Sequence, residues 1–171
     1  TKTKNSVTTS TNKIVLGQFQ KSSFNEQTMW LLSDHGVRIL INAPSAESFT
    51  PAKQTKLILY GLPNGNTIEQ TVGKITATNE DWHFNIQHIG AQTRFPREKL
   101  TNENIVIAYL ENSLKSWPAW RKQFGDQAVF EIVEKITARF EAFAPKIILT
   151  GHSGGGSFTF GYLNCVEKIP D

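Results

Sequence analysis

The chain has 171 residues, of which 39% are hydrophobic and 19% charged, and its net charge is +3. This length and composition are typical of one folded domain and exclude a largely disordered chain. Its apolar runs are too short for a transmembrane helix, which needs about 20 residues, and no run of Lys and Arg indicates a nucleic-acid partner. The single cysteine, Cys165, cannot form a disulfide within the chain.

The first predicted elements are antiparallel strands. Residues 1–12 are polar, show no apolar periodicity and are predicted to be disordered, so the domain is expected to span residues 13–171. Strands are predicted at 13–19, 28–33 and 37–43. The last two flank Asp34-His35-Gly36, a three-residue hairpin loop in which Gly36 takes the left-handed conformation.

From residue 56 onward, strands and helices alternate. Strands are predicted at 56–60, 105–110 and 146–150, and their nearly continuous apolar sequences indicate burial on both faces of a sheet. Helices are predicted within 67–75 (capped by Asn66), 81–100, 112–124, 126–143 (capped by Asp126) and 154–166. This order predicts an α/β fold in which antiparallel strands at the start are followed by parallel strands with crossover helices.

The most specific motif is Gly151-His152-Ser153-Gly154-Gly155, which follows the strand 146–150 directly and precedes a predicted helix. A serine on such a sharp turn is strained, and glycines on either side remove Cβ atoms that would collide around it. In this strand–turn–helix context, Gly-x-Ser-x-Gly is typical of a nucleophile elbow. At these residues, and in its order of strands, the chain resembles the α/β-hydrolase superfamily.

The resemblance implies a serine hydrolase that acts on a small-molecule ester or acyl substrate. Ser153 would be the nucleophile that forms the acyl-enzyme, and the N–H of Gly154 would hold the oxyanion. A second N–H would come from the loop after the strand 56–60. Pro63 has no N–H, so Leu62 or Asn64 would donate, and Leu62 is preferred because it follows the glycine. No cofactor and no metal ion are expected.

The triad partners of Ser153 are not evident. In the superfamily the acid and then the histidine follow the nucleophile, whereas the four histidines of this chain all precede Ser153: His35, His83, His88 and His152. The resemblance therefore predicts an incomplete domain, truncated after the elbow helix. The sheet edge beside the elbow strand is expected to be exposed and open to association. A catalytically inactive domain that binds a ligand or partner stays open as the alternative.

Other interpretations of the same residues fit less well. The glycine-rich turn lacks the Gly-Lys-Ser/Thr of a phosphate-binding loop and the third glycine of a dinucleotide fingerprint. His83 and His88 are not spaced as a helical metal-binding pair. Trp82, Trp117, Trp120 and Tyr109 form either a substrate wall or ordinary packing. The composition leans towards a secreted or periplasmic protein.

Overall fold

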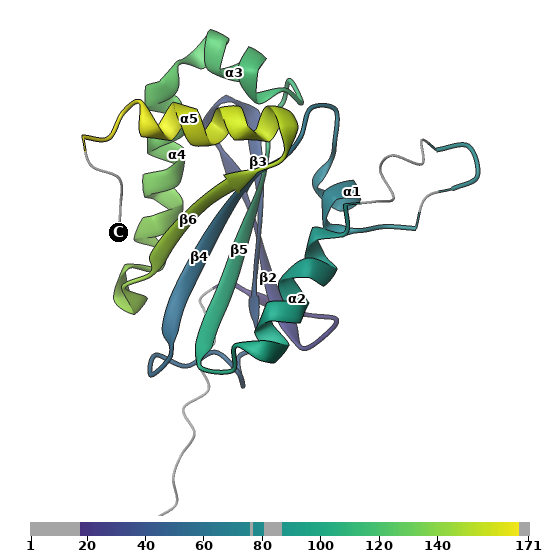
Figure 1. Ribbon diagram of the computed structural model, residues 1–171, viewed down its shortest axis with the longest axis vertical. Helices are drawn as coiled ribbons and strands as arrows, with labels where there is room; N and C mark the ends of the chain where they lie inside the picture. The colour runs from purple at the N-terminus through teal and green to yellow at the C-terminus, as the bar shows by residue number, and fades with distance from the viewer. Residues whose placement is uncertain (1–17, 76, 81–86, 168–171) are drawn as a thin grey trace, which may run out of the picture.

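The computed structural model describes residues 18–75, 77–80 and 87–167, which form an α/β fold (Figure 1). The predicted disorder of residues 1–12 lies outside the described residues. The strands are β1 (Gln20–Ser22), β2 (Glu26–Ser33), β3 (Val37–Pro44), β4 (Gln54–Gly61), β5 (Glu103–Glu111) and β6 (Lys146–Gly151). The helices are α1 (Ile68–Val72), α2 (Ile89–Lys99), α3 (Trp117–Phe124), α4 (Asp126–Ala138) and α5 (Gly156–Leu163).

The described strands form one mixed sheet in the order β1-β2-β3-β5-β4-β6. The pairs β1–β2, β2–β3 and β3–β5 are antiparallel, whereas β4 pairs in parallel with both β5 and β6. The predicted change from antiparallel to parallel strands is therefore confirmed. The β2–β3 turn is a 3-10 turn, η1 (Asp34–Gly36), and Gly36 has the expected positive φ of 68°.

Helices cover both faces of the sheet, so the protein has three layers (Figure 1). The larger apolar cluster joins Val106, Ala108 and Leu110 of β5 to α3, α4 and α5. The smaller one joins Ile107 and Tyr109, which point to the opposite face, to α1 and α2. Because β5 is central, its side chains are buried on both faces, which explains its nearly unbroken apolar sequence. No helix of the described chain has the length and hydropathy needed to cross a membrane.

Several predicted boundaries are wrong. Of the predicted strand 13–19, residues 13–17 lie outside the described residues, and Gln18 and Phe19 precede the first described strand, which begins at Gln20. Helix α1 is capped by Thr67, not Asn66, because the Thr67 side chain and Gln70 form a reciprocal capping box. Helix α4 has the predicted apolar stripe but ends at Ala138, and a separate 3-10 turn, η3 (Glu141–Phe143), follows it. Of the predicted helix 81–100, residues 81–86 lie outside the described residues.

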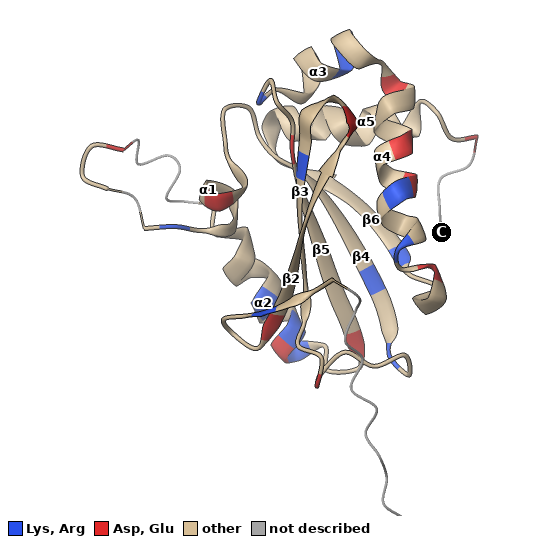
Figure 2. Ribbon diagram, turned by 180° about the vertical axis from the view of Figure 1, so that it is seen from behind, with Lys and Arg blue, Asp and Glu red and all other residues tan. Residues whose placement is uncertain are grey.

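Asp126 does not cap α4 but connects three helices. Its carboxylate accepts hydrogen bonds from Arg121 of α3 at 2.7 Å and from Asn164, just after α5, at 2.7 Å. Arg121 also donates to the Ser157 carbonyl and hydroxyl on α5. The hydrogen bond from Arg121, followed by that from Asn164, holds the pKa of Asp126 below its usual value. Figure 2 shows acidic residues along the first part of α4 and basic residues toward its end.

A buried ion-pair network fastens α2 to the antiparallel part of the sheet. Glu26, at the start of β2, is only 3% exposed. Its carboxylate accepts hydrogen bonds from Arg94 at 3.0 Å and Arg97 at 2.9 Å, and from the amide of Asn42 on β3 at 2.8 Å. Arg97 also donates to the carbonyls of Asn42 and Ile105. The buried carboxylate is therefore fully compensated, and the two arginines share it as their counter-ion.

We expect Glu26→Ala to lower the free energy of unfolding by about 3–5 kcal/mol, because it leaves the largely buried Arg97 and the partly buried Arg94 without their counter-ion. Urea denaturation measures this change. Glu98→Ala is the matched control, since Glu98 forms no ion pair with another described residue. It is expected to change stability by less than about 0.5 kcal/mol. Equal effects of the two substitutions would contradict a structural role for the network.

We also expect Asp126→Asn to make the protein less sensitive to acid. The pKa of Asp126 is lowered by folding, so the stabilisation is present above the unfolded value of about 3.9 and is lost as the pH falls through the lower folded value. The difference in unfolding free energy between wild type and variant should therefore shrink as the pH drops from about 6 to about 2. A constant difference across that range would show that Asp126 acts through packing alone.

Candidate functional site

The Gly-x-Ser-x-Gly motif forms a sharp turn at the end of β6. His152 is still extended, Ser153 has a positive φ of 51°, and a 3-10 turn, η4 (Ser153–Gly155), leads directly into α5. Positive φ is unusual for a residue with a side chain and marks strained backbone. The predicted geometry is thus confirmed: the serine lies at the end of a strand, its backbone is strained and a helix follows at once. Ser153 is exposed to solvent.

Glycines permit this turn because backbone packs against backbone. A Cβ on Gly155 would overlap the carbonyl oxygen of Gly61 and lie 2.7 Å from its carbonyl carbon. A Cβ on Gly151 would lie 2.6 Å from the Gly155 carbonyl group. Real Cβ atoms do not approach other atoms so closely, so side chains at these positions would push the turn away from the end of β4.

The loop after β4 lies beside the elbow, as predicted. Gly61 and Gly151 are register partners in the parallel pair β4–β6, so both chains leave the sheet at the same edge. Asn64 of this loop packs over Gly154: its Oδ1 overlaps the position where a Gly154 Cβ would be, and its Cγ and Nδ2 lie 2.5 and 2.9 Å from that position. The two segments meet although about 90 residues separate them in the sequence.

The preference for Leu62 as an oxyanion donor is wrong. Its backbone N–H donates to the carbonyl of Leu110 at 3.2 Å, which extends the β4–β5 ladder by one residue, and Leu62 is only 3% exposed. The N–H of Gly154, in contrast, makes no hydrogen bond to another described residue. It belongs to the first turn of a helical segment, where N–H groups lack intrahelical acceptors.

No general base for Ser153 is found within the described residues. The Ser153 hydroxyl makes no hydrogen bond to a described histidine. The ring of His35 stacks on Phe124 with centroids 4.3 Å apart. His88, the residue just before α2, lies against Gly73. His83 lies outside the described residues. Burial raises the pKa of Tyr60, near the end of β4, so this hydroxyl stays protonated.

Two further sets of candidates have structural roles. Trp117, Trp120 and Tyr109 are at most 1% exposed, so these aromatic residues form core and not a substrate wall. Trp82 lies outside the described residues. Glu111 accepts hydrogen bonds from the first N–H of α1, on Ile68, at 2.8 Å and from Arg38 at 3.0 Å. It therefore caps a helix. No group of three or more potential metal ligands occurs among the described residues.

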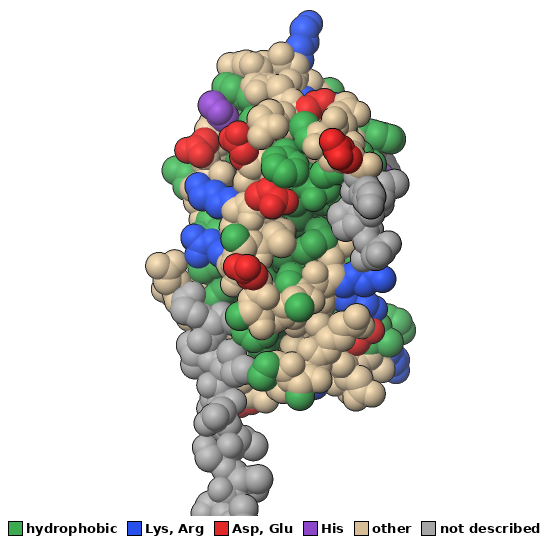
Figure 3. All heavy atoms as spheres, turned by 90° about the vertical axis from the view of Figure 1, so that its left-hand side faces the viewer, with side chains coloured by type: hydrophobic (Ala, Val, Ile, Leu, Met, Phe, Trp, Pro, Cys, Tyr) green, Lys and Arg blue, Asp and Glu red, His purple; other side chains and the backbone are tan. Residues whose placement is uncertain are grey.

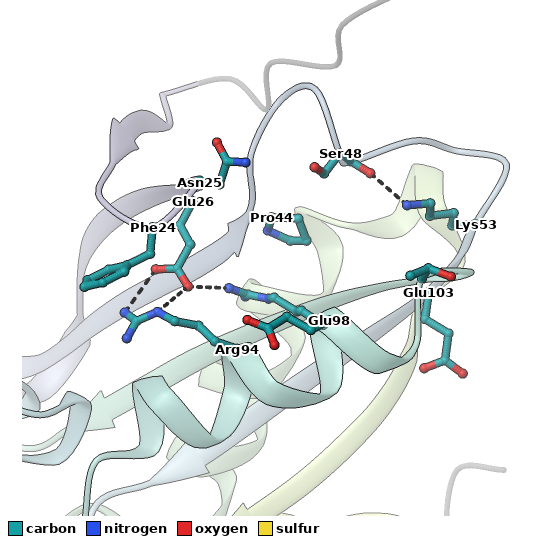
Figure 4. A pocket seen from close by; sticks show the side chains of 11 residues that line it. Phe24, Asn25, Glu26, Pro44, Ser48, Lys53, Arg94, Glu98 and Glu103 are labelled. Atoms are coloured by element: carbon teal, nitrogen blue, oxygen red, sulfur yellow. Dashed lines mark hydrogen bonds and ion pairs between the residues drawn. The ribbon is translucent and has the colours of Figure 1, made fainter.

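A cavity of about 540 Å³ lies at the opposite end of the sheet, where β2 and β5 begin (Figure 4). Phe24, Arg94, Glu98 and Lys53 are among its lining residues. Figure 4 shows Glu26 and Arg94 turned toward each other in it, and Lys53 is bonded to the Ser48 carbonyl. Because its buried charges already satisfy one another, the cavity shows no specific ligand chemistry. No local sequence pattern predicted this cavity.

We expect Gly155→Ala to lower the free energy of unfolding by about 3 kcal/mol, because the new methyl group would meet the rigid Gly61 backbone. Gly156→Ala is the matched control. Gly156 is helical, with φ of −58°, and has nothing within 4 Å of its Cβ position. This substitution should stabilise the protein by about 0.5 kcal/mol. The urea midpoints of the two variants and of wild type measure these changes. A Gly155→Ala variant as stable as wild type would refute the packing argument.

No protein-family model matches the sequence, and neither a curated protein nor a solved structure is significantly similar to it. The geometry at Ser153 is therefore the observation from which function is inferred.

Proposed function

We propose that this chain is a serine hydrolase of the α/β-hydrolase type that cleaves carboxylic esters with Ser153 as its nucleophile. One observation carries the proposal: an exposed serine with φ of 51° stands between a parallel strand and a helix, in a Gly-x-Ser-x-Gly sequence. Strained backbone of this kind clusters at functional sites. Of the eight described non-glycine residues with positive φ, Ser153 is the one that lies in a Gly-x-Ser-x-Gly sequence. A mere strand–helix connection would need neither the strain nor the serine.

The surrounding sheet supports the proposal. Three parallel strands, β5, β4 and β6, end at one edge, and ligands of α/β proteins bind at this carboxyl edge. The loop after β4 and the elbow meet there, which is where the superfamily gathers its oxyanion donors. The antiparallel start of the sheet agrees with the same resemblance.

The proposed reaction is acyl transfer to water. The Ser153 hydroxyl oxygen attacks the ester carbon, and the Gly154 N–H stabilises the charge that develops on the carbonyl oxygen. The alcohol leaves with a proton, and water then hydrolyses the acyl-enzyme. A serine hydroxyl is weak without a base to take its proton, so we expect this 171-residue chain alone to turn over esters far more slowly than ordinary esterases.

A catalytically inactive binding domain is the second candidate, and the position of β6 favours it. Among the described strands, β6 is at the sheet edge, so half of its backbone N–H and C=O groups face away from β4. Its residues are only partly buried. Hydrophobic side chains gather on the side of the molecule where β6 and α4 lie (Figure 3). Such an edge suits association with another polypeptide strand.

Covalent labelling distinguishes the two candidates. We expect a fluorophosphonate in excess to form one adduct, located at Ser153 by peptide mass mapping and absent from Ser153→Ala. Because no described base contacts this serine, the labelling rate should rise steadily between about pH 6 and 9 without a plateau near 6.5, the ordinary pKa of histidine. No adduct, or adducts spread equally over several serines such as the exposed Ser113, would favour the binding domain.

A further inference from the structure

The loop after β4 has few backbone groups that can bind an oxyanion. The N–H of Leu62 is committed to the carbonyl of Leu110, and Pro63 has no N–H. The N–H of Gly65 donates to the carbonyl of Lys115 at 2.8 Å, and that of Asn66 donates to the carbonyl of Pro63. Among the residues from 62 to 66, the backbone N–H of Asn64 and the side-chain amides of Asn64 and Asn66 make no hydrogen bond to another described residue. Asn66 is buried, so only Asn64 presents free donors at the surface.

The Asn64 side chain packs against Gly154. Its carboxamide occupies the space over Gly154 that any other residue at that position would fill with its Cβ. It therefore stands beside the residue whose N–H is the expected first donor. Asn64 is exposed, so its amide faces solvent, from which a substrate would approach Ser153. A carboxamide offers two N–H donors through Nδ2.

The loop holds Asn64 in place. Gly65, with φ of 80°, lies in a turn that is closed by the hydrogen bond from the Asn66 N–H to the Pro63 carbonyl. The N–H of Gly65 ties this turn to the carbonyl of Lys115. Asn66 is 4% exposed, and Pro63 is buried. These contacts fix the backbone from which the Asn64 side chain extends, so less reorganisation is needed to bring its amide to an oxyanion.

We infer that the Asn64 carboxamide is the second oxyanion donor of this site, in place of a backbone N–H. The inference rests on the proposed function. As the Ser153 oxygen bonds to the acyl carbon, the carbonyl π pair moves onto oxygen, and Nδ2 of Asn64 and the N–H of Gly154 both donate to it. The Ser153 proton passes to solvent. The pair returns as the alkoxide leaves and takes a proton from solvent. The identity of Gly154 is thereby explained, since a side chain there would displace the donor.

The inference is tested with two reagents that label serine, a dialkyl aryl phosphate and its thiono analogue. In the first an oxygen accepts the hydrogen bonds, and in the second a sulfur, which accepts them poorly. Asn64→Ala should slow phosphate labelling of Ser153 by on the order of 10²-fold. It should slow thionophosphate labelling much less, so the ratio of the two rates falls. Asn64→Asp keeps the shape of the side chain but removes its N–H donors, so it should lower the ratio of the two rates as Asn64→Ala does.

Asn102→Ala, a substitution of an exposed turn asparagine, is the matched control and should leave both rates unchanged. Urea midpoints of all variants should equal that of wild type. If wild type is labelled at Ser153 and both Asn64 variants keep its rate ratio, the role of Asn64 is refuted while the proposed function stands. If wild type itself is not labelled at Ser153, the proposed function fails and the role of Asn64 fails with it.

Discussion

The candidate site depends on the contact between three glycine backbones, those of Gly61, Gly151 and Gly155, where β4 and β6 end. Without Cβ atoms, the turn after β6 can rest on the end of β4, and the start of α5 follows from that turn. The same contact brings the loop after β4 to the serine. Strain at Ser153 is sustained because the surrounding packing leaves the chain no relaxed alternative. The geometry of the candidate site and the stability of the fold are therefore set by the same few atoms.

Features encoded within a short stretch of sequence could be predicted. The elbow is recognisable because strand, turn and helix are consecutive and the glycines are part of the motif. The stripe of α4 is visible because helical spacing repeats along one segment, and Val129, Ile132 and Ile136 are indeed buried. The unbroken apolar run of β5 correctly indicated a strand covered on both faces. In each case the physical cause acts between near neighbours in the chain.

Features that depend on residues distant in the sequence could not be predicted. The Leu62 N–H seemed free because its acceptor, Leu110, belongs to a strand 48 residues later. The contact of Asn64 with Gly154 and the pairing of Glu26 with Arg97 likewise join segments that only the tertiary structure brings together. Local competition also mattered: Thr67 displaced Asn66 as the cap because Gln70 completes its capping box. The proposed role of the Asn64 side chain had no signal in the sequence.

The position of β4 has a consequence for how the protein folds. It lies between β5 and β6, both of which follow it in the chain, so neither neighbour is present when β4 is synthesised. Its parallel pairing with β6 closes a loop of about 90 residues. Such non-local contacts form slowly, because the chain loses conformational entropy before the contacts contribute any stabilisation. The elbow is therefore completed among the last parts of the fold. Until then an apolar strand stays open on one side, and the nascent chain is most prone to aggregate during that interval.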